Sequence, residues 1–121
     1  MKPQLPEFTQ LRQDTTPEGR PLLQIDFTLA PDSVYFQGHF PEAPLLPGVT
    51  QLDWAAQIAA DHWHTPRSVS TIEVLKFNDM LLPRADVTLR LEFKRDNCVV
   101  FRYQCGERAM SSGRLIFAEP S

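Results

Sequence analysis

Apolar and polar residues alternate in several segments of the chain, and one segment has a helical pattern instead. From Leu23 to Leu29 apolar side chains occupy every second position, as expected for a strand with one buried face. The same reasoning predicts further strands at residues 68–77, 87–93, 98–105 and 108–117. Because a short apolar run at 34–36 adds a further candidate, the pattern predicts five or six mostly antiparallel strands.

The segment from Gly48 to about Trp63 is the one long stretch with the pattern of a helix. Pro47 and Gly48 suit the start of a helix, and the alanines that follow are strong helix formers. The expected apolar stripe covers more than half of the circumference and consists of Val49, Leu52, Ala55, Ala56, Ala59, Ala60 and Trp63. A mostly buried helix with these strands predicts an α+β fold, with an antiparallel sheet wrapped around one central helix.

Length and composition favour a single domain. The chain has 121 residues, of which 42% are hydrophobic, so it can bury a core without disulfides or metal ions. Residues 1–121 are therefore predicted to form one domain. Prolines and a glycine interrupt residues 1–20, which we expect to form a loosely structured N-terminal arm.

Charge and cysteine usage exclude several classes of partner. A net charge of -3 gives no attraction to nucleic acid or to an anionic membrane surface. The first ten residues lack the apolar run of a signal peptide, and no transmembrane stretch follows. Cys98 and Cys105 lie at an odd offset on one predicted strand, so a disulfide between them is not expected. We therefore expect a cytoplasmic protein with free thiols.

The candidate chemistry lies in residues 38–57, which read GHFPEAPLLPGVTQLDWAAQ. His39 lies in a proline-bounded loop, and Asp53 lies on a helix that otherwise avoids charge. Gly48 begins that helix, where free backbone N–H groups and the positive end of the dipole can stabilise a negative charge. These three residues are the candidates for a functional site.

Each candidate also has an ordinary structural explanation. His39 could cap a neighbouring residue, and Gly48 could serve only a tight turn. Asp53 could be solvated at the rim of the helix or buried with a partner, and Gln57 lies four residues on, where it could hold the carboxyl group. The residues alone leave these alternatives open.

The same stretch resembles the signature of the hot-dog-fold 3-hydroxyacyl-acyl-carrier-protein dehydratases of the FabZ/FabA type. That signature is a His-Phe-Pro loop, then Pro-Gly-Val, then a helix carboxylate fourteen residues after the histidine, and His39 and Asp53 have this spacing. The run from Leu45 to Trp54 is similar to dehydratases of aryl polyene pigment pathways, described as ApeI-like. Glu42 departs from the pattern because many relatives have glycine there, and aspartate replaces the commoner glutamate at position 53.

The resemblance implies removal of water from a 3-hydroxyacyl thioester on an acyl carrier protein, in fatty-acid or polyene biosynthesis, without a cofactor or a metal ion. It assigns His39 as the base at C2, Asp53 as the acid for the departing hydroxyl group and the Gly48 N–H as the oxyanion donor. Phe40, Pro47 and Gln57 would support the site. Because a carboxyl group in water is ionised at neutral pH, the acid role requires burial, and an ionised Asp53 would instead orient the hydroxyl group or a water molecule.

The resemblance also implies an assembly. The site of these enzymes is shared between subunits, so His39 of one chain is expected to face Asp53 of another in a homodimer, in a higher oligomer of dimers, or in a pair with a related dehydratase. One helix cannot cover both sides of so small a sheet, and a two-fold dimer would cover the rest.

Three other interpretations fit parts of the sequence. A thioesterase of the same fold would use the helix carboxylate to activate water and would not need the His-Phe-Pro loop. A non-catalytic carrier-binding subunit would pair with an active relative and leave His39 and Asp53 without a role. A metal site at His62 and His64 is disfavoured because residues two apart do not share a helix face.

Overall fold

The computed structural model of the protein describes residues 5–29, 46–66 and 68–117. The elements, in chain order, are β1 (Phe8–Thr15), β2 (Pro21–Thr28), α1 (Gly48–Trp63), β3 (Val69–Phe77), β4 (Asp86–Arg95), β5 (Cys98–Cys105) and β6 (Arg108–Phe117). The predicted helix is confirmed at the expected bounds, and the strands from β2 to β6 are confirmed within about two residues at each end.

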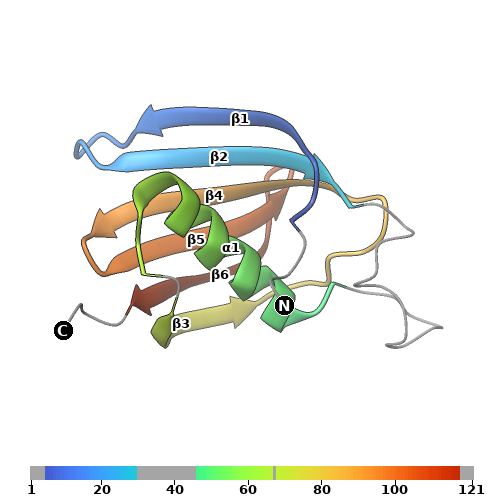
Figure 1. The fold of residues 1–121 in the computed structure, drawn as a ribbon. Coiled ribbons are helices and arrows are strands. Elements are labelled where there is room, and N and C mark those ends of the chain that lie inside the picture. Colours follow the sequence, from blue (N-terminus) through green and yellow to red (C-terminus); the bar gives the residue numbers. More distant parts are fainter. Residues whose placement is uncertain (1–4, 30–45, 67, 118–121) are drawn as a thin grey trace.

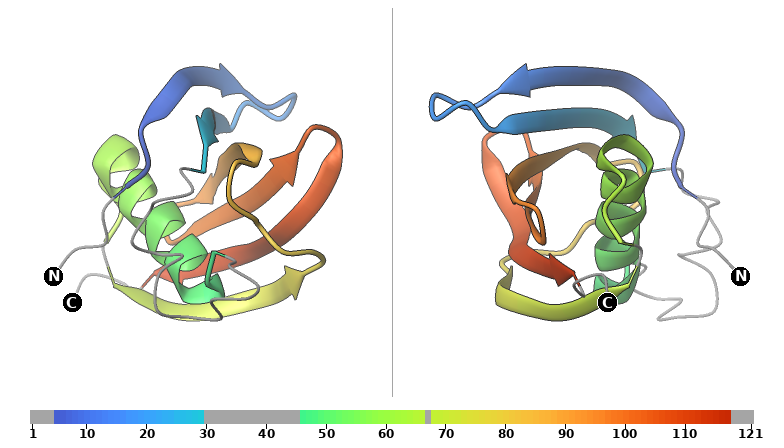
Figure 2. Two further views of the ribbon diagram at one scale, coloured as in Figure 1. Left: turned by 90° about the vertical axis from the view of Figure 1, so that its right-hand side faces the viewer. Right: turned by 60° about the vertical axis from the view of Figure 1, so that its left-hand side comes forward.

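The six strands form one antiparallel sheet with the order β1-β2-β4-β5-β6-β3. The sheet curves around α1, which lies against its concave face (Figures 1 and 2). This arrangement confirms the predicted α+β architecture. It leaves β1 and β3 as the two edges of the sheet, and β3 runs beside the first turn of α1 (Figure 1).

The core lies between the helix and the inner face of the sheet. Alternation along β2 places Leu23, Ile25 and Phe27 in this core, as predicted. Two edge-to-face aromatic pairs join the helix to the sheet: Trp54 packs on Phe27 with ring centroids 5.8 Å apart, and Trp63 packs on Phe93 at 5.5 Å. The pair of Trp63 and Phe93 lies at the C-terminal end of α1.

The buried face of α1 differs in part from the predicted apolar stripe. Its buried residues are Thr50, Gln51, Trp54, Ala55, Ala56, Ile58, Ala59 and Ala60. Val49, which was predicted to be buried, is 67% exposed, whereas Thr50 and Gln51 are buried. Periodicity ranks positions by polarity and cannot detect a polar side chain whose hydrogen bonds are satisfied inside the protein.

The expectation of a loosely structured arm over residues 1–20 is wrong for residues 8–15. These residues form β1, which pairs with β2 along its length. Six of its eight side chains are exposed, so the strand lacks the alternation by which the other strands are recognised. Backbone hydrogen bonds to β2, which side-chain patterning does not reveal, therefore determine its structure.

No helix in the described ranges combines the length and the apolar content that crossing a membrane requires.

Candidate active site

The first turn of α1 has an open, positively polarised end. Pro47 precedes the helix with extended backbone angles (φ -60°, ψ 146°), and its carbonyl accepts hydrogen bonds from the N–H groups of Thr50 and Gln51. No side chain of a described residue caps the helix, and its first turn contains no acidic residue. Within the part of the chain that the structure describes, nothing accepts a hydrogen bond from the N–H groups of Gly48 and Val49. These two groups can therefore bind an anion or a developing oxyanion.

The Phe77 ring of β3 packs closely against Gly48 at this point. A Cβ atom at position 48 would lie 2.8 Å from Cζ of the Phe77 ring, which is closer than van der Waals contact allows. Phe77 itself is 50% exposed, so its ring lies at the surface beside the start of the helix. The apolar pattern predicted a strand at residues 68–77 but did not place Phe77 at the site.

Asp53 lies on the exposed side of α1, one turn after Val49. Gln57 is half-buried, and neither side chain makes a hydrogen bond to a described residue, so the expected contact between them is not present in the single chain. The described residues therefore do not supply the burial that a proton-donating role requires. His39, Phe40 and Glu42 lie outside the described residues.

A group of buried hydrogen bonds lies directly beneath the first turn of α1. The Gln51 side chain donates from Nε2 to the Leu46 carbonyl at 3.1 Å and accepts at Oε1 from the Ser111 hydroxyl at 2.7 Å. The Tyr103 hydroxyl donates to the Gln51 carbonyl at 2.6 Å. All four residues are buried, and Gln51 is only 3% exposed. We call these residues the Gln51 network.

The sequence contains a signal for the Gln51 network. Gln51 shares a helix face with Ala55 and Ile58, which follow at offsets of four and seven residues. A polar residue on an apolar face must find hydrogen-bond partners when it is buried. The identity of those partners, on β5 and β6, depends on the sheet register.

The hydroxyl group of Tyr103 is held in its protonated, donating form. Burial raises its pKa well above the usual value, and the nearby Asp53 carboxylate raises the pKa further. Asp53 therefore interacts electrostatically with the Gln51 network, although no hydrogen bond joins them.

This shift predicts a loss of stability in alkali. In the unfolded chain the tyrosine ionises near pH 10, whereas the folded state keeps the proton to higher pH, so the free energy of unfolding should fall as the pH rises above about 10. Tyr103→Phe removes the ionisable group and should make this fall shallower. Urea unfolding of both proteins at about pH 8 and about pH 11 tests this expectation, and equal losses in the two proteins would contradict it.

The edge strand β3 contains a β-bulge in its pairing with β6. Val74 and Leu75 together face Gly113, and Val74 has a left-handed backbone conformation (φ 46°) that is rare for a β-branched residue. Several large apolar side chains in and near this strand are exposed: Val74, Leu75, Phe77, Met80 and Leu82. Together with Val49 they form what we call the apolar edge.

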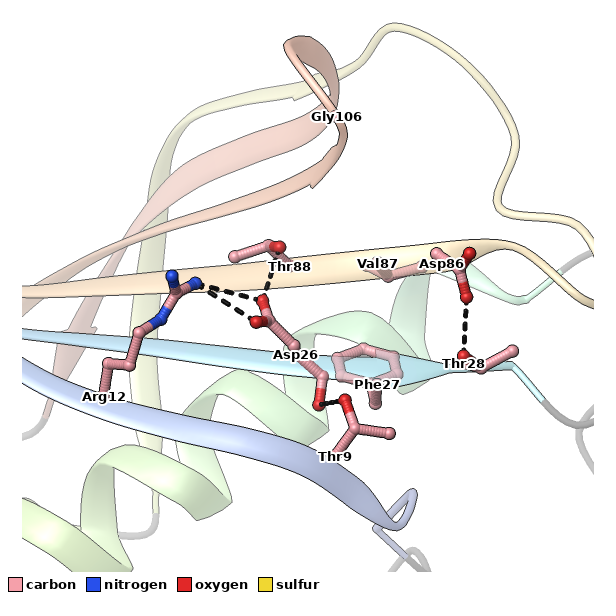
Figure 3. A pocket seen from close by; sticks show the side chains of 9 residues that line it. All are labelled: Thr9, Arg12, Asp26, Phe27, Thr28, Asp86, Val87, Thr88 and Gly106. Carbon is pink, nitrogen blue, oxygen red and sulfur yellow. Dashed lines mark hydrogen bonds and ion pairs between the residues drawn. The ribbon is translucent and has the colours of Figure 1, made fainter.

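Two hollows lie on the outer face of the sheet, away from the helix. One is lined by residues of β1, β2 and β4, and its polar groups bind one another: Asp26 accepts hydrogen bonds from Arg12 and Thr88, and Asp86 accepts one from Thr28 (Figure 3). These satisfied contacts hold neighbouring strands together and offer no free group for chemistry. The second hollow is lined by Val74, Lys76, Lys94, Val100, Ser112, Gly113 and Arg114.

The remaining histidines and both cysteines have structural surroundings. His64 ends α1 in a left-handed conformation and donates its N–H to the Ala60 carbonyl. Across the described residues, no three His, Cys, Asp or Glu side chains come close enough together to hold a metal ion. Cys98 and Cys105 are free, and burial, with Asp86 and Asp79 adding to it, raises the pKa of the Cys105 thiol.

Comparisons with known proteins agree with this architecture. The chain superposes on one chain of a structure described as the dehydratase heterocomplex ApeI:P from Xenorhabdus doucetiae. The TM-score is 0.78 at 30% identity, and the match covers 96% of this chain and 100% of the other chain. It also superposes on an uncharacterised protein from Erwinia carotovora subsp. atroseptica with a TM-score of 0.80 at 29% identity, covering 95% and 97% of the two chains. The helix wrapped by a six-stranded antiparallel sheet is the hot-dog fold.

Sequence comparison identifies one family among the proteins with this fold. The family described as ApeI-like, ApeI dehydratase, matches residues 13–114, and the chain belongs to this family. Two curated relatives are 3-hydroxyacyl-acyl-carrier-protein dehydratases named FabZ, from Bordetella parapertussis (28% identical over 95 residues, 68% of this chain) and Erythrobacter litoralis (34% over 79 residues, 58% of this chain). The matched regions cover 62% and 52% of these relatives, so the chain spans less than two thirds of their length.

Proposed function

We propose that this chain removes water from 3-hydroxyacyl thioesters on an acyl carrier protein and forms trans-2-enoyl thioesters. The observation that carries the proposal is the helix start at Gly48, where two N–H groups that bind no described residue lie about one turn from Asp53. The two curated FabZ relatives support the reaction class. The proposed setting is the cytoplasm, in fatty-acid or polyene biosynthesis, with no cofactor.

In the proposed mechanism, three groups divide the reaction. His39 accepts the proton from C2, and electron density moves toward the thioester oxygen, where the Gly48 N–H stabilises it. The C3–O bond then breaks, and the hydroxyl group leaves as water with a proton from Asp53. The double bond forms between C2 and C3. No bound ion is needed, because the helix start supplies the positive potential.

We propose a dimer that completes this site. The edge of β3 is open in the described chain, so a second copy can add its own β3 there. Such pairing would cover the apolar edge, including Val49, and would bring the partner close to Asp53, which lies one turn away. That burial would favour the protonated form that donates to the hydroxyl group.

A second candidate assembly is a pair with a related dehydratase. The ApeI:P structure is named as a dehydratase heterocomplex, and this chain matches it at 30% identity over its whole length. In such a pair this chain would supply one half of each site, or would act as a non-catalytic partner. Sedimentation of the purified chain, alone and with a candidate partner, would distinguish the two assemblies.

The reaction is tested by offering the purified protein 3-hydroxyacyl-carrier substrates that differ in acyl length and unsaturation. Mass spectrometry should detect the loss of one water molecule from the acyl chain, with no release of the free carrier thiol. His39→Ala serves as the inactive control. Release of thiol without water loss would identify a thioesterase, and no change of any substrate in the presence of a partner would contradict the proposal.

The outer sheet face supports a protein carrier as the partner. Four cations there, Lys76, Arg90, Lys94 and Arg102, have no ion pair with any described residue, and Arg90 lies directly opposite Arg102. Like charges at this spacing repel one another, so an acidic protein surface that binds over them is favoured. Val100 supplies an apolar floor between them.

We therefore predict that Lys76→Glu/Lys94→Glu raises KM for a carrier-bound substrate by about tenfold, which is about 1.4 kcal/mol of binding. Turnover of the same acyl group on N-acetylcysteamine should stay within about twofold, because the small thioester does not need the docking surface. Arg12→Glu/Arg108→Glu makes the same change of charge elsewhere and should leave both KM values near wild type. Equal effects on the two substrates would rule out docking at this face.

A further inference from the structure

The Gln51 network connects parts of the chain that are far apart in sequence. Gln51 lies in the first turn of α1, Tyr103 on β5 and Ser111 on β6, while Leu46 precedes the helix. The Leu46 N–H donates in turn to the Leu81 carbonyl at 2.8 Å, in the connection between β3 and β4. The start of the helix is thereby fixed to the sheet from two directions.

These polar groups are not required for core stability alone. Each buried donor or acceptor loses its contacts with water, so a satisfied bond contributes little more than an apolar pair of the same shape. A fully satisfied network does specify one arrangement of the segments that it joins. The arrangement specified here is the position of the first turn of α1 relative to β5 and β6.

The residues that bond to Gln51 lie in one row across the sheet, and this row also contacts Gly48. Tyr103 pairs with Ser111 across β5 and β6, and Ser111 pairs with Phe77 across β6 and β3. The Phe77 ring packs on Gly48, while Tyr103 and Ser111 bond to Gln51. One row of side chains therefore determines both the height and the rotation of the helix start above the sheet.

We propose that Gln51, held by Ser111 and Tyr103, is a positioning residue that fixes the Gly48 N–H and the Asp53 carboxylate in their working positions. The inference rests on the proposed function, in which these two groups contact the thioester. Gln51 is buried and acts through the helix backbone, two residues before Asp53 and three after Gly48.

Kinetics of single variants provide the first test. Ser111→Ala and Tyr103→Phe should each lower kcat about tenfold and change KM less than about twofold, because a small displacement of the oxyanion donor affects the transition state more than substrate binding. Thr15→Ala is the control, since its exposed hydroxyl lies on β1, away from the Gln51 network and from the proposed docking surface. The proposal would be overturned if Ser111→Ala and Tyr103→Phe lost thermal stability but kept kcat within about twofold of wild type.

A double-mutant cycle tests whether Ser111 acts through Gln51. Gln51→Leu alone and Gln51→Leu/Ser111→Ala should have the same kcat, because the serine has no glutamine to hold in the double variant. If the two losses multiply, Ser111 acts by another route and the proposal fails.

An NMR measurement separates this inference from the proposed function. The backbone amide resonances of Gly48 and Val49 should shift or broaden in Ser111→Ala and in Tyr103→Phe, and should be unchanged in Thr15→Ala. This readout does not need turnover, so it decides the positioning role even for a protein that dehydrates no substrate. Unchanged Gly48 and Val49 resonances in Ser111→Ala and Tyr103→Phe would overturn the proposal.

Discussion

His39→Ala and Asp53→Ala proteins, each inactive alone, should recover about a quarter of wild-type activity when they are unfolded and refolded together in equal amounts. Random pairing makes about half of the dimers mixed, and each mixed dimer has one intact site out of two. The expectation follows from a site that takes the histidine from one subunit and the carboxylate from the other.

The structure gives a physical reason for this prediction. Asp53 is exposed on the single chain, and its neighbour Val49 is an apolar residue in contact with solvent. A carboxylate that works as an acid needs a drier environment than this surface provides. A second subunit over the apolar edge would exclude water from Asp53 and would bring the required base close to it.

Two controls make the result interpretable. Each variant refolded with itself should stay inactive. Wild-type protein taken through the same procedure defines full activity. Mass spectrometry of the mixture should show that mixed dimers have formed. Mixed dimers without activity would mean that each site is built within one chain, and the shared site would have to be abandoned.

Phe101→Ala should produce the largest loss of stability among single core substitutions, about 3–5 kcal/mol. Phe101 is fully buried on β5, and its ring lies in the space left by Gly113, where a Cβ atom would come within 2.8 Å of it. The ring also packs edge-to-face on Tyr103 with centroids 6.0 Å apart. Its removal leaves a cavity that Gly113, which has no side chain, cannot fill.

Chemical denaturation with a matched surface variant measures this effect. Arg102→Ala changes the next residue, whose side chain is exposed on the other face of β5, and should alter the free energy of unfolding by no more than about 0.5 kcal/mol. A loss below about 1 kcal/mol in Phe101→Ala would mean that neighbouring side chains refill the space. The close packing inferred around Gly113 would then be wrong.

The sequence by itself determined the elements with strong periodic patterns. The alternation from Leu23 to Leu29 and the helical run from Gly48 to Trp63 each follow from local apolar spacing, and the structure has both. The motif with His39 and Asp53 led to the dehydratase family, which the family match over residues 13–114 confirmed. The roles of those two residues stay predictions.

The tertiary structure alone decided which groups surround the start of the helix. The ring of Phe77 on Gly48 and the bonds of Ser111 and Tyr103 to Gln51 depend on the pairing of β3, β6 and β5. Strand order and register arise from contacts between residues far apart in sequence, which local patterns do not encode. For the same reason β1, whose side chains are mostly exposed, was found only from its backbone pairing with β2.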